Sequence, residues 1–396
     1  MNGEDMPIGT GERLLEELLM DAHAAAPMDV PQLADRYATS LGLERVTIHL
    51  VDLQQRLLVP LSRGEPVLGV DDSLAGWSYR TVSLQVANDD GGELVAWLPL
   101  VDGAERLGVL GVRTPMLDGS TLRRCRMLAA LLPMVITSKR TYSDSYARQT
   151  RSESMRLTAE MLRAFLPPRT LGTERVVSTA VLEPAYELGG DAFDHSLTKD
   201  TLHAAILDAM GHDLASGLTA SVAMAGCRNA RRNGADLVDM VHNVDQALAT
   251  WLPDRFCTGV FLHLDLSTGC LRWINCGHPP PLLIRAQRVI EHALEGVPEP
   301  PLGLPARLTE PARSVHEVSL EPGDRVLLYT DGVTEARADN GELFGLDSFT
   351  EFIIRATAAG EPAPETLRRL VHAILGHQRS RLTDDATILL VEWLSP

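Results

Sequence analysis

The chain has 396 residues, of which 45% are hydrophobic and 22% charged, and its formal net charge is −17. This length allows two or three domains, and the composition is that of an ordinary globular protein. The acidic balance argues against nucleic acid as a partner, because phosphate backbones are bound by Lys and Arg. It suits a protein that binds divalent cations, although an excess of acid also simply keeps surfaces soluble.

Hydropathy and cysteine usage predict a cytoplasmic protein. The longest apolar run, residues 127–136, is too short to cross a bilayer, and the N-terminus lacks the pattern of a secretory signal. The cysteines are odd in number and have no C-x-x-C spacing, which favours buried free thiols in a reducing compartment. They are Cys125, Cys227, Cys257, Cys270 and Cys276. A zinc site formed by Cys276 and His278 is a weaker alternative.

Residues 1–125 are predicted to form a first domain of α/β structure. Apolar residues recur at spacings of three and four over residues 13–26 and again over 30–43, which predicts two helices. Alternating, strand-like runs follow, and the last two, 93–101 and 106–114, are joined by an Asp-Gly turn. This order of helices, a meander of strands and a closing helix resembles a GAF sensor domain.

Residues 126–166 are predicted to be a helical linker with few apolar positions in its middle. Pro167 and Pro168 end the helix, because proline cannot continue it and restricts the residue before it. The linker is either a solvated spacer or a helix that pairs with its twin in a homodimer. The segment has no sustained apolar heptad that would indicate pairing, so both alternatives stay open.

Residues 167–396 are predicted to form a third region with its strands and helices grouped in blocks. Consecutive helices are expected over 214–234 and 235–252, and again over 346–359 and 364–379, with strand-like runs between the two pairs. Blocks of this kind favour a layered α+β fold over a doubly wound parallel sheet.

Acidic residues recur in this region where strands end or turns begin. The stretch ELGGDAFDH, residues 187–195, presents Asp191 and Asp194 after two glycines that make a sharp turn easy. Asp208, Asp331 and the pair Asp384-Asp385 also adjoin hydrophobic runs. One such aspartate alone is best explained as a turn former or helix cap. Their recurrence favours a site of hard oxygen ligands, which suits Mg²⁺ or Mn²⁺ better than zinc.

Five segments resemble, in this order, the bacterial protein phosphatase 2C-like family in its SpoIIE/RsbU branch. They are LGGDAFD, ILDAMGHDLASGLTAS, LRWINCGHPPPLLI, GDRVLLYTDGVTEAR and TDDATILLV. The resemblance covers residues 175–394 and implies a layered antiparallel β-sandwich flanked by helices. A GAF-like sensor domain and a helical linker ahead of the phosphatase domain also fit that branch.

The resemblance implies a site for two Mn²⁺ or Mg²⁺ ions. Asp191 and Asp208 would bridge the ions, with the backbone carbonyl of Ala209 as a further ligand. Asp331 and Asp384 would bind one metal from the opposite side. A water held between the ions would attack the phosphorus directly, without a covalent enzyme intermediate.

The same resemblance implies supporting residues around these ligands. Gly190 and Asp385 adjoin ligand positions, and Asp194 is expected to hydrogen-bond a ligand or a metal-bound water. His212 is a candidate general acid, with simple packing as the favoured alternative.

Loops of two other motifs are expected near the site. Asn275, Gly277 and His278 should shape a turn rather than react, and Glu335 and Arg337 should line the approach of the phosphoprotein.

The sequence departs from the family in places, and other readings stay open. Asp213 stands where the family usually has glycine, which places a negative charge near the proposed metals. Ala192 occupies the position where the GGDEF turn of a diguanylate cyclase needs an acid, so a cyclase is disfavoured. A non-catalytic scaffold that keeps the phosphatase fold and a small-molecule phosphatase remain alternatives.

The function expected from the sequence is that of a metal-dependent serine/threonine protein phosphatase. By resemblance, its substrate is a phosphorylated anti-sigma-factor antagonist. The first domain would sense an unknown ligand or activating protein, within a homodimer, and no role with nucleic acid or membrane is expected.

Overall fold

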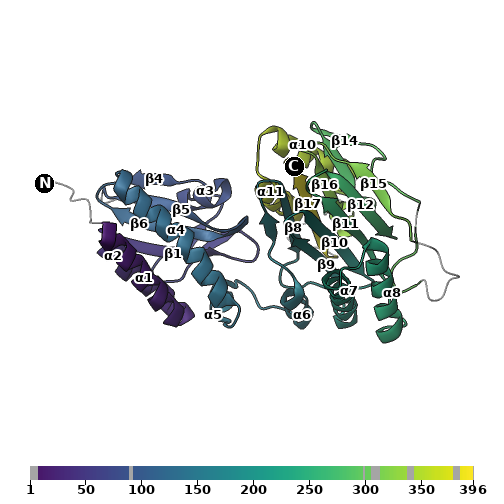
Figure 1. Cartoon of the computed structure of the whole chain (residues 1–396), viewed down its shortest axis with the longest axis horizontal. Coiled ribbons are helices and arrows are strands. Elements are labelled where there is room, and N and C mark those ends of the chain that lie inside the picture. Colours follow the sequence, from purple (N-terminus) through teal and green to yellow (C-terminus); the bar gives the residue numbers. More distant parts are fainter. Residues whose placement is uncertain are drawn as a thin grey trace. The chain divides into compact units, whose positions relative to one another are not determined.

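The computed structural model describes residues 8–88, 92–297, 299–304, 313–336, 343–377 and 384–395, with backbone only for 8–15. The chain divides into two compact units, Met1–Ser152 and Glu153–Pro396. Their helices and strands are labelled in Figure 1.

The first unit is a six-stranded antiparallel sheet with helices on both faces. The strand order is β3-β2-β1-β6-β5-β4. The strands are β1 (Arg45–Val51), β2 (Leu57–Pro60), β3 (Leu68–Gly69), β4 (Gln85–Asn88), β5 (Leu94–Asp102) and β6 (Glu105–Thr114). The helices are α1 (Ile8–Ala24), η1 (Pro27–Asp29), α2 (Val30–Ser40), α3 (Leu74–Thr81), α4 (Gly119–Arg140) and α5 (Ser145–Thr150). A large core lies between the sheet and α1, α2 and α4, and a smaller one lies under α3.

The expected linker at 126–166 is divided between the two units and is not a separate body. Helix α4 buries Cys125, Leu128, Leu132 and Ile136 in the core of the first unit. Their spacing of three and four residues places them on one helix face, which explains why α4 packs there. Helix α6 (Leu157–Phe165) instead buries Ala159 and Leu162 in the second unit's core. The division between the two compact units falls at residue 152, within the span 126–166 that the sequence predicted to be a linker.

The second unit contains two antiparallel sheets. The five-stranded sheet has the order β15-β12-β11-β10-β9, and the six-stranded sheet has the order β14-β13-β16-β17-β8-β7. The strands are β7 (Thr170–Gly172), β8 (Val176–Glu183), β9 (Asp191–Leu197), β10 (Thr201–Ala209), β11 (Cys257–Asp265), β12 (Cys270–Cys276), β13 (Leu282–Arg285), β14 (Arg288–Ile290), β15 (His316–Ser319), β16 (Arg325–Tyr329) and β17 (Ala386–Trp393). The remaining helices are α7 (Leu214–Arg232), α8 (Leu237–Trp251), α9 (Asp331–Thr334), α10 (Gly345–Ala358) and α11 (Ala363–His377).

Alternation along the strands shows how these layers stack. In β17, Ile388 and Leu390 pack with α10 and α11, whereas Leu389 and Val391 lie in the core between the two sheets. That inner core also takes Ile206 from the facing sheet, whose outer face contacts α7 and α8. The unit is therefore a β-sandwich with helices outside (Figure 1), and the predicted layered antiparallel α+β fold is confirmed.

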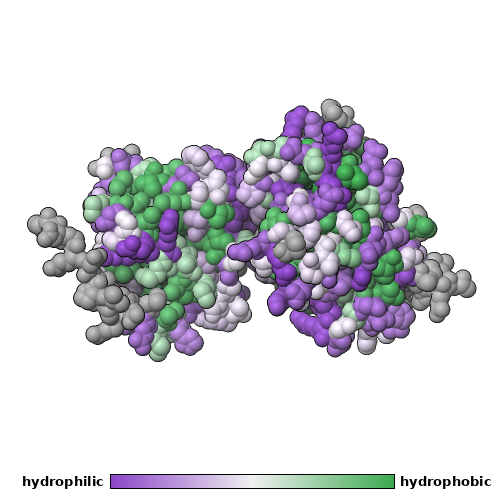
Figure 2. All heavy atoms as spheres, turned by 45° about the horizontal axis from the view of Figure 1, so that its top comes forward, coloured by the Kyte–Doolittle hydropathy of each residue, from purple (hydrophilic) through white to green (hydrophobic). Residues whose placement is uncertain are grey.

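The surfaces of the two units are mixed in polarity. Figure 2 shows hydrophilic and hydrophobic residues interspersed over the visible face of each. Over the described part of the chain, every helix is too short or too polar to pass through a bilayer.

Strand β9 is tied to its surroundings by a buried histidine. His195 has its Nε2 2.8 Å from the carbonyl oxygen of Pro168 and its Nδ1 2.9 Å from Ser178 Oγ. Because a carbonyl only accepts, Nε2 carries the hydrogen and Nδ1 accepts from Ser178. Burial lowers the pKa of His195 from its ordinary 6.5 to about 4, so the folded state holds this ring uncharged.

Substituting His195→Gln should lower the free energy of unfolding most at pH 7 and above. The unfolded state binds more protons between about 6.5 and about 4, so the stability that His195 contributes is lost as the pH falls through this window. Urea unfolding of parent and variant at several pH values measures the difference. A difference that stays constant from pH 7.5 to roughly pH 4 would contradict this account.

Candidate functional site

Asp191 and Asp208 face each other at the ends of neighbouring strands. They are register partners in the β9–β10 pair. Asp191 is buried and Asp208 half-buried. The turn before Asp191 needs glycine, because a Cβ on Gly190 would lie 2.4 Å from the carbonyl oxygen of Ala209. Gly190 therefore lets the Gly-Gly-Asp turn lie directly against the strand that carries Asp208.

Asp385 holds this turn from the other sheet. Its Oδ2 accepts hydrogen bonds from the backbone N–H groups of Gly189 (2.7 Å), Gly190 (2.8 Å) and Asp191 (3.1 Å). Asp385 is itself buried and directly precedes β17. Its predicted supporting role thus has a definite form in the structure, which is to fix the backbone of the turn.

Two threonines that the sequence analysis missed contact Asp191. The hydroxyl groups of Thr330 and Thr387 donate to Asp191 Oδ2 at 2.8 and 2.7 Å. Both side chains are buried; Thr387 belongs to β17, and Thr330 directly follows β16. The signal in the sequence was their place beside acidic motifs, in YTDG and DDAT.

The carboxylates of the site raise one another's pKa. Burial, followed by repulsion from Asp331, Asp384 and Asp385, raises the pKa of Asp208 to about 7. Burial and the nearby Asp208 raise the pKa of Asp191 well above its ordinary value. The pKa of Asp331 is also raised, by burial first and then by Asp384. The predicted aspartates therefore lie near enough to act on one another electrostatically.

The outer two aspartates are more open to solvent. Asp331 is the first residue of α9 and Asp384 directly precedes Asp385, and both are exposed. Across the described ranges, no three His, Cys, Asp or Glu side chains are arranged so that together they hold a metal ion. The carboxylates gather in one place without converging on one point. Their oxygens are nevertheless the donors that Mg²⁺ and Mn²⁺ prefer.

The Asn275–His278 segment shapes a turn, as predicted. Asn275 accepts from the His278 backbone N–H and donates to the His278 carbonyl, both at 2.8 Å. Gly277 between them has φ +70. His278 is buried, with Nε2 3.0 Å from the Tyr329 carbonyl and Nδ1 2.8 Å from Thr258 Oγ1. It holds the end of β16, and these contacts leave it no part in the weaker zinc alternative.

Asp194 does not have the role expected from the sequence. It lies on the opposite face of β9 from Asp191 and is buried between Arg228 and Arg231 of α7. Its Oδ1 is 2.6 Å from Arg228 and its Oδ2 2.7 Å from Arg231. Both oxygens are occupied by guanidinium groups, so Asp194 anchors α7 to β9 and does not contact the other carboxylates.

The remaining predicted residues lie at the edge of the site. His212 is exposed, and its backbone packs against Gly189. Asp213 is the N-cap of α7, where its side chain accepts from Ser216 N at 2.9 Å. This explains an acid at a position where glycine was expected, since Asp is a favoured cap. Glu335 is exposed just after α9, and Arg337 lies outside the described residues.

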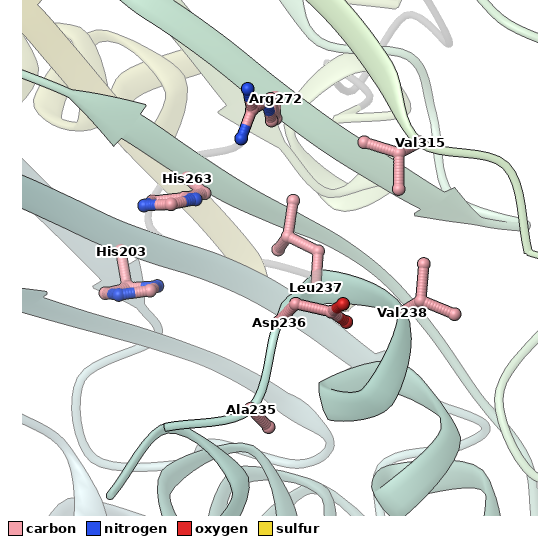
Figure 3. A pocket seen from close by; sticks show the side chains of 8 residues that line it. All are labelled: His203, Ala235, Asp236, Leu237, Val238, His263, Arg272 and Val315. Atoms are coloured by element: carbon pink, nitrogen blue, oxygen red, sulfur yellow. The ribbon is translucent and has the colours of Figure 1, made fainter. Parts of the chain in front are cut away.

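Apart from the carboxylate site, a pocket lies on the outer face of the five-stranded sheet. It has a volume of about 300 Å³ and is bounded on one side by the start of α8 (Figure 3). His203, His263 and Arg272 are successive register partners across β10, β11 and β12. The two imidazole rings stack with centroids 4.8 Å apart. His203 and Asp208 point to opposite faces of β10, so this pocket is separate from the carboxylates.

Comparison with known proteins relates this region to bacterial phosphatases. Residues 198–394 match the family Stage II sporulation protein E (SpoIIE). Protein IcfG of Synechocystis sp. is 27% identical over 257 residues, which cover 57% of this chain and 39% of that protein. Phosphoserine phosphatase RsbP of Bacillus subtilis is 27% identical over 177 residues, which cover 42% of this chain and 43% of that protein. The chain thus spans about two fifths of the length of these two relatives.

The fold has a counterpart among solved structures. The SiaA-PP2C domain of Pseudomonas aeruginosa matches with a TM-score of 0.51 at 23% sequence identity. The match covers 59% of this chain and 94% of that chain. The second unit therefore has the PP2C-like fold that the ordered motifs predicted.

Asp194→Asn should destabilise the fold by about 3–5 kcal/mol, because it removes the buried carboxylate that pairs with two partly buried guanidinium groups. Asp200→Asn is the matched control, since Asp200 pairs with Arg175 at the surface and should contribute about 0–1 kcal/mol. Urea unfolding with a chelator present measures both. Equal small losses in the two variants would refute the anchoring role of Asp194.

Proposed function

We propose that the chain, whose residues 198–394 match the SpoIIE family, is a metal-dependent phosphoserine/phosphothreonine protein phosphatase. The observation that carries the proposal is the gathering of Asp191, Asp208, Asp331 and Asp384 at the edge of the sandwich, where burial and then repulsion from Asp331 and Asp384 raise the pKa of Asp208. Carboxylates held this close ionise together only with compensating positive charge. Divalent cations supply that charge and accept these oxygen donors.

Five residues of the chain would hold the metal ions in the proposed reaction. Asp191, Asp208 and the Ala209 carbonyl offer oxygens from the five-stranded sheet, Asp331 offers its oxygens from the start of α9, and Asp384 offers its oxygens from the segment before β17. When bound, a pair of Mn²⁺ or Mg²⁺ ions supplies an acidified water and neutralises phosphoryl charge.

Two further residues would contribute to the reaction without binding the metal ions. Asp385 keeps the Gly-Gly-Asp turn in place through its three backbone hydrogen bonds. His212, exposed beside Gly189, is the candidate that would give a proton to the departing serine or threonine oxygen.

The substrate and regulation are inferred from the relatives. Two of them are phosphoserine phosphatases, RsbP and RsbU, the latter 21% identical over 246 residues that cover 71% of that protein. This supports a phosphorylated anti-sigma-factor antagonist as the substrate here. The element order of the first unit supports a GAF-like sensor of a ligand or activating protein. A cytoplasmic homodimer completes the proposal.

Asp208→Asn should abolish Mn²⁺-dependent hydrolysis of p-nitrophenyl phosphate while the chain stays folded, because one bridging carboxylate is lost. Asp236→Asn is the matched control, since Asp236 only caps α8 and Asn caps equally well. Initial rates with Mn²⁺, with Mg²⁺ and with a chelator test the proposal. Full activity in Asp208→Asn would disprove the metal assignment.

Removing residues 1–152 should change the turnover rate if the first unit regulates the second. The remaining residues, 153–396, keep α6 and the whole inner core, so this boundary is better than a cut at 167. The same assay on both proteins measures the effect, with thermal unfolding as a check of folding. An unchanged rate would contradict regulation, and no turnover in either protein would favour a non-catalytic scaffold.

A further inference from the structure

Thr330 and Thr387 occupy positions where hydrophobic residues would be expected. Thr387 of β17 lies on the inner face of the six-stranded sheet, in line with Leu389 of the inner core. Thr330 follows β16 in an extended conformation, in line with Leu328, and is the N-cap of α9, but its side chain makes no capping hydrogen bond. Both threonines are fully buried. Valine has nearly the same shape, and a buried hydroxyl costs free energy unless it is hydrogen-bonded. The hydroxyl groups at these two positions therefore call for an explanation beyond packing.

The hydrogen bonds around the two threonines point both hydroxyl groups at one oxygen atom. Thr387 N donates to Thr330 Oγ1 at 2.9 Å, and Thr330 N donates to the Thr387 carbonyl at 3.0 Å. Since Thr330 Oγ1 already accepts a hydrogen there, its own proton is directed at Asp191 Oδ2, 2.8 Å away. Thr387 Oγ1 donates to the same Oδ2 at 2.7 Å.

We propose that Thr330 and Thr387 are positioning residues for metal binding, a hydroxyl pair that holds Oδ2 of the Asp191 carboxylate and leaves Oδ1 as the oxygen that would bind a divalent cation. Both hydroxyls are donors toward Oδ2, and a carboxylate that accepts two such bonds cannot rotate without breaking them. The backbone of Asp191 is held as well, by Asp385. The ligand is therefore oriented before any cation binds, which is how partners behind a metal ligand raise affinity.

This inference rests on the proposed function, because it assigns a role toward the same metal site. It adds residues from two distant segments to that site. It also predicts that substituting either threonine weakens the affinity for the cation before it changes any other property.

The test compares Thr330→Val and Thr387→Val with Thr330→Ser and Thr387→Ser in the full chain. Mn²⁺ binding is measured by calorimetry, and p-nitrophenyl phosphate turnover is measured as a function of Mn²⁺ concentration. Each valine variant should weaken Mn²⁺ binding by about 10–100-fold, the range expected when a partner behind a ligand is lost. Saturating Mn²⁺ should recover much of the rate, and the serine variants should bind close to the parent value.

Thr366→Val is the matched control. Thr366 is also fully buried, but its hydroxyl has no hydrogen-bond partner among the residues that the structure describes, and it lies in α11, away from the carboxylates. This variant should bind Mn²⁺ like the parent. Each valine variant leaves one hydroxyl on Asp191 and the packing volume intact, so if one of them does not fold, the other carries the same test.

The outcomes separate this proposal from the proposed function. If the parent binds Mn²⁺ and both valine variants match its affinity and its Mn²⁺ dependence, the positioning role is wrong while the phosphatase proposal stands. A purely structural role would lower thermal stability without changing Mn²⁺ affinity, and this result also overturns the inference. If the parent neither binds Mn²⁺ nor turns over substrate, the proposed function fails and this inference fails with it.

Discussion

The site of the second unit depends on hydrogen bonds that cross from one sheet of the sandwich to the other. Asp385 accepts three backbone N–H groups of the Gly189–Asp191 turn, and Thr330 and Thr387 donate to Asp191 itself. These contacts join β9 and the turn before it to residues in and beside β16 and β17 of the facing sheet. They set the position of Asp191, and through the β9–β10 register they set its relation to Asp208.

The same contacts offset part of an electrostatic cost. Burial and mutual repulsion raise the pKa of Asp191, Asp208 and Asp385. The hydroxyl donors lower the pKa of Asp191, and the backbone donors lower the pKa of Asp385. A cluster of this kind is unfavourable for folding, since each carboxylate is taken from water and placed beside another. Such strain is typical of a site shaped for a ligand of opposite charge. The fold supplies the rigid strands on which the cluster is held.

Charged groups on the other face of β9 have a different purpose. Asp194 lies only three residues after Asp191, yet strand alternation turns it toward α7, where Arg228 and Arg231 pair with both of its oxygens. Of the two carboxylates in this short motif, Asp191 therefore belongs to the site, and Asp194 attaches the helix layer to the sheet. On the same face as Asp191, the uncharged His195 attaches β9 to Ser178 and Pro168.

The sequence by itself determined the layered fold of residues 167–396 and the four aspartates that gather at its edge, because these follow from periodicity and from ordered local motifs. Only the tertiary structure decided the pairing of Asp194 with Arg228 and Arg231, the burial of α4 in the first unit and the contacts of Thr330 and Thr387 with Asp191. Those two threonines lie 139 and 196 residues from Asp191 along the chain. A local pattern shows which face a side chain takes, but not which distant strand lies opposite it. That depends on how the sheets stack.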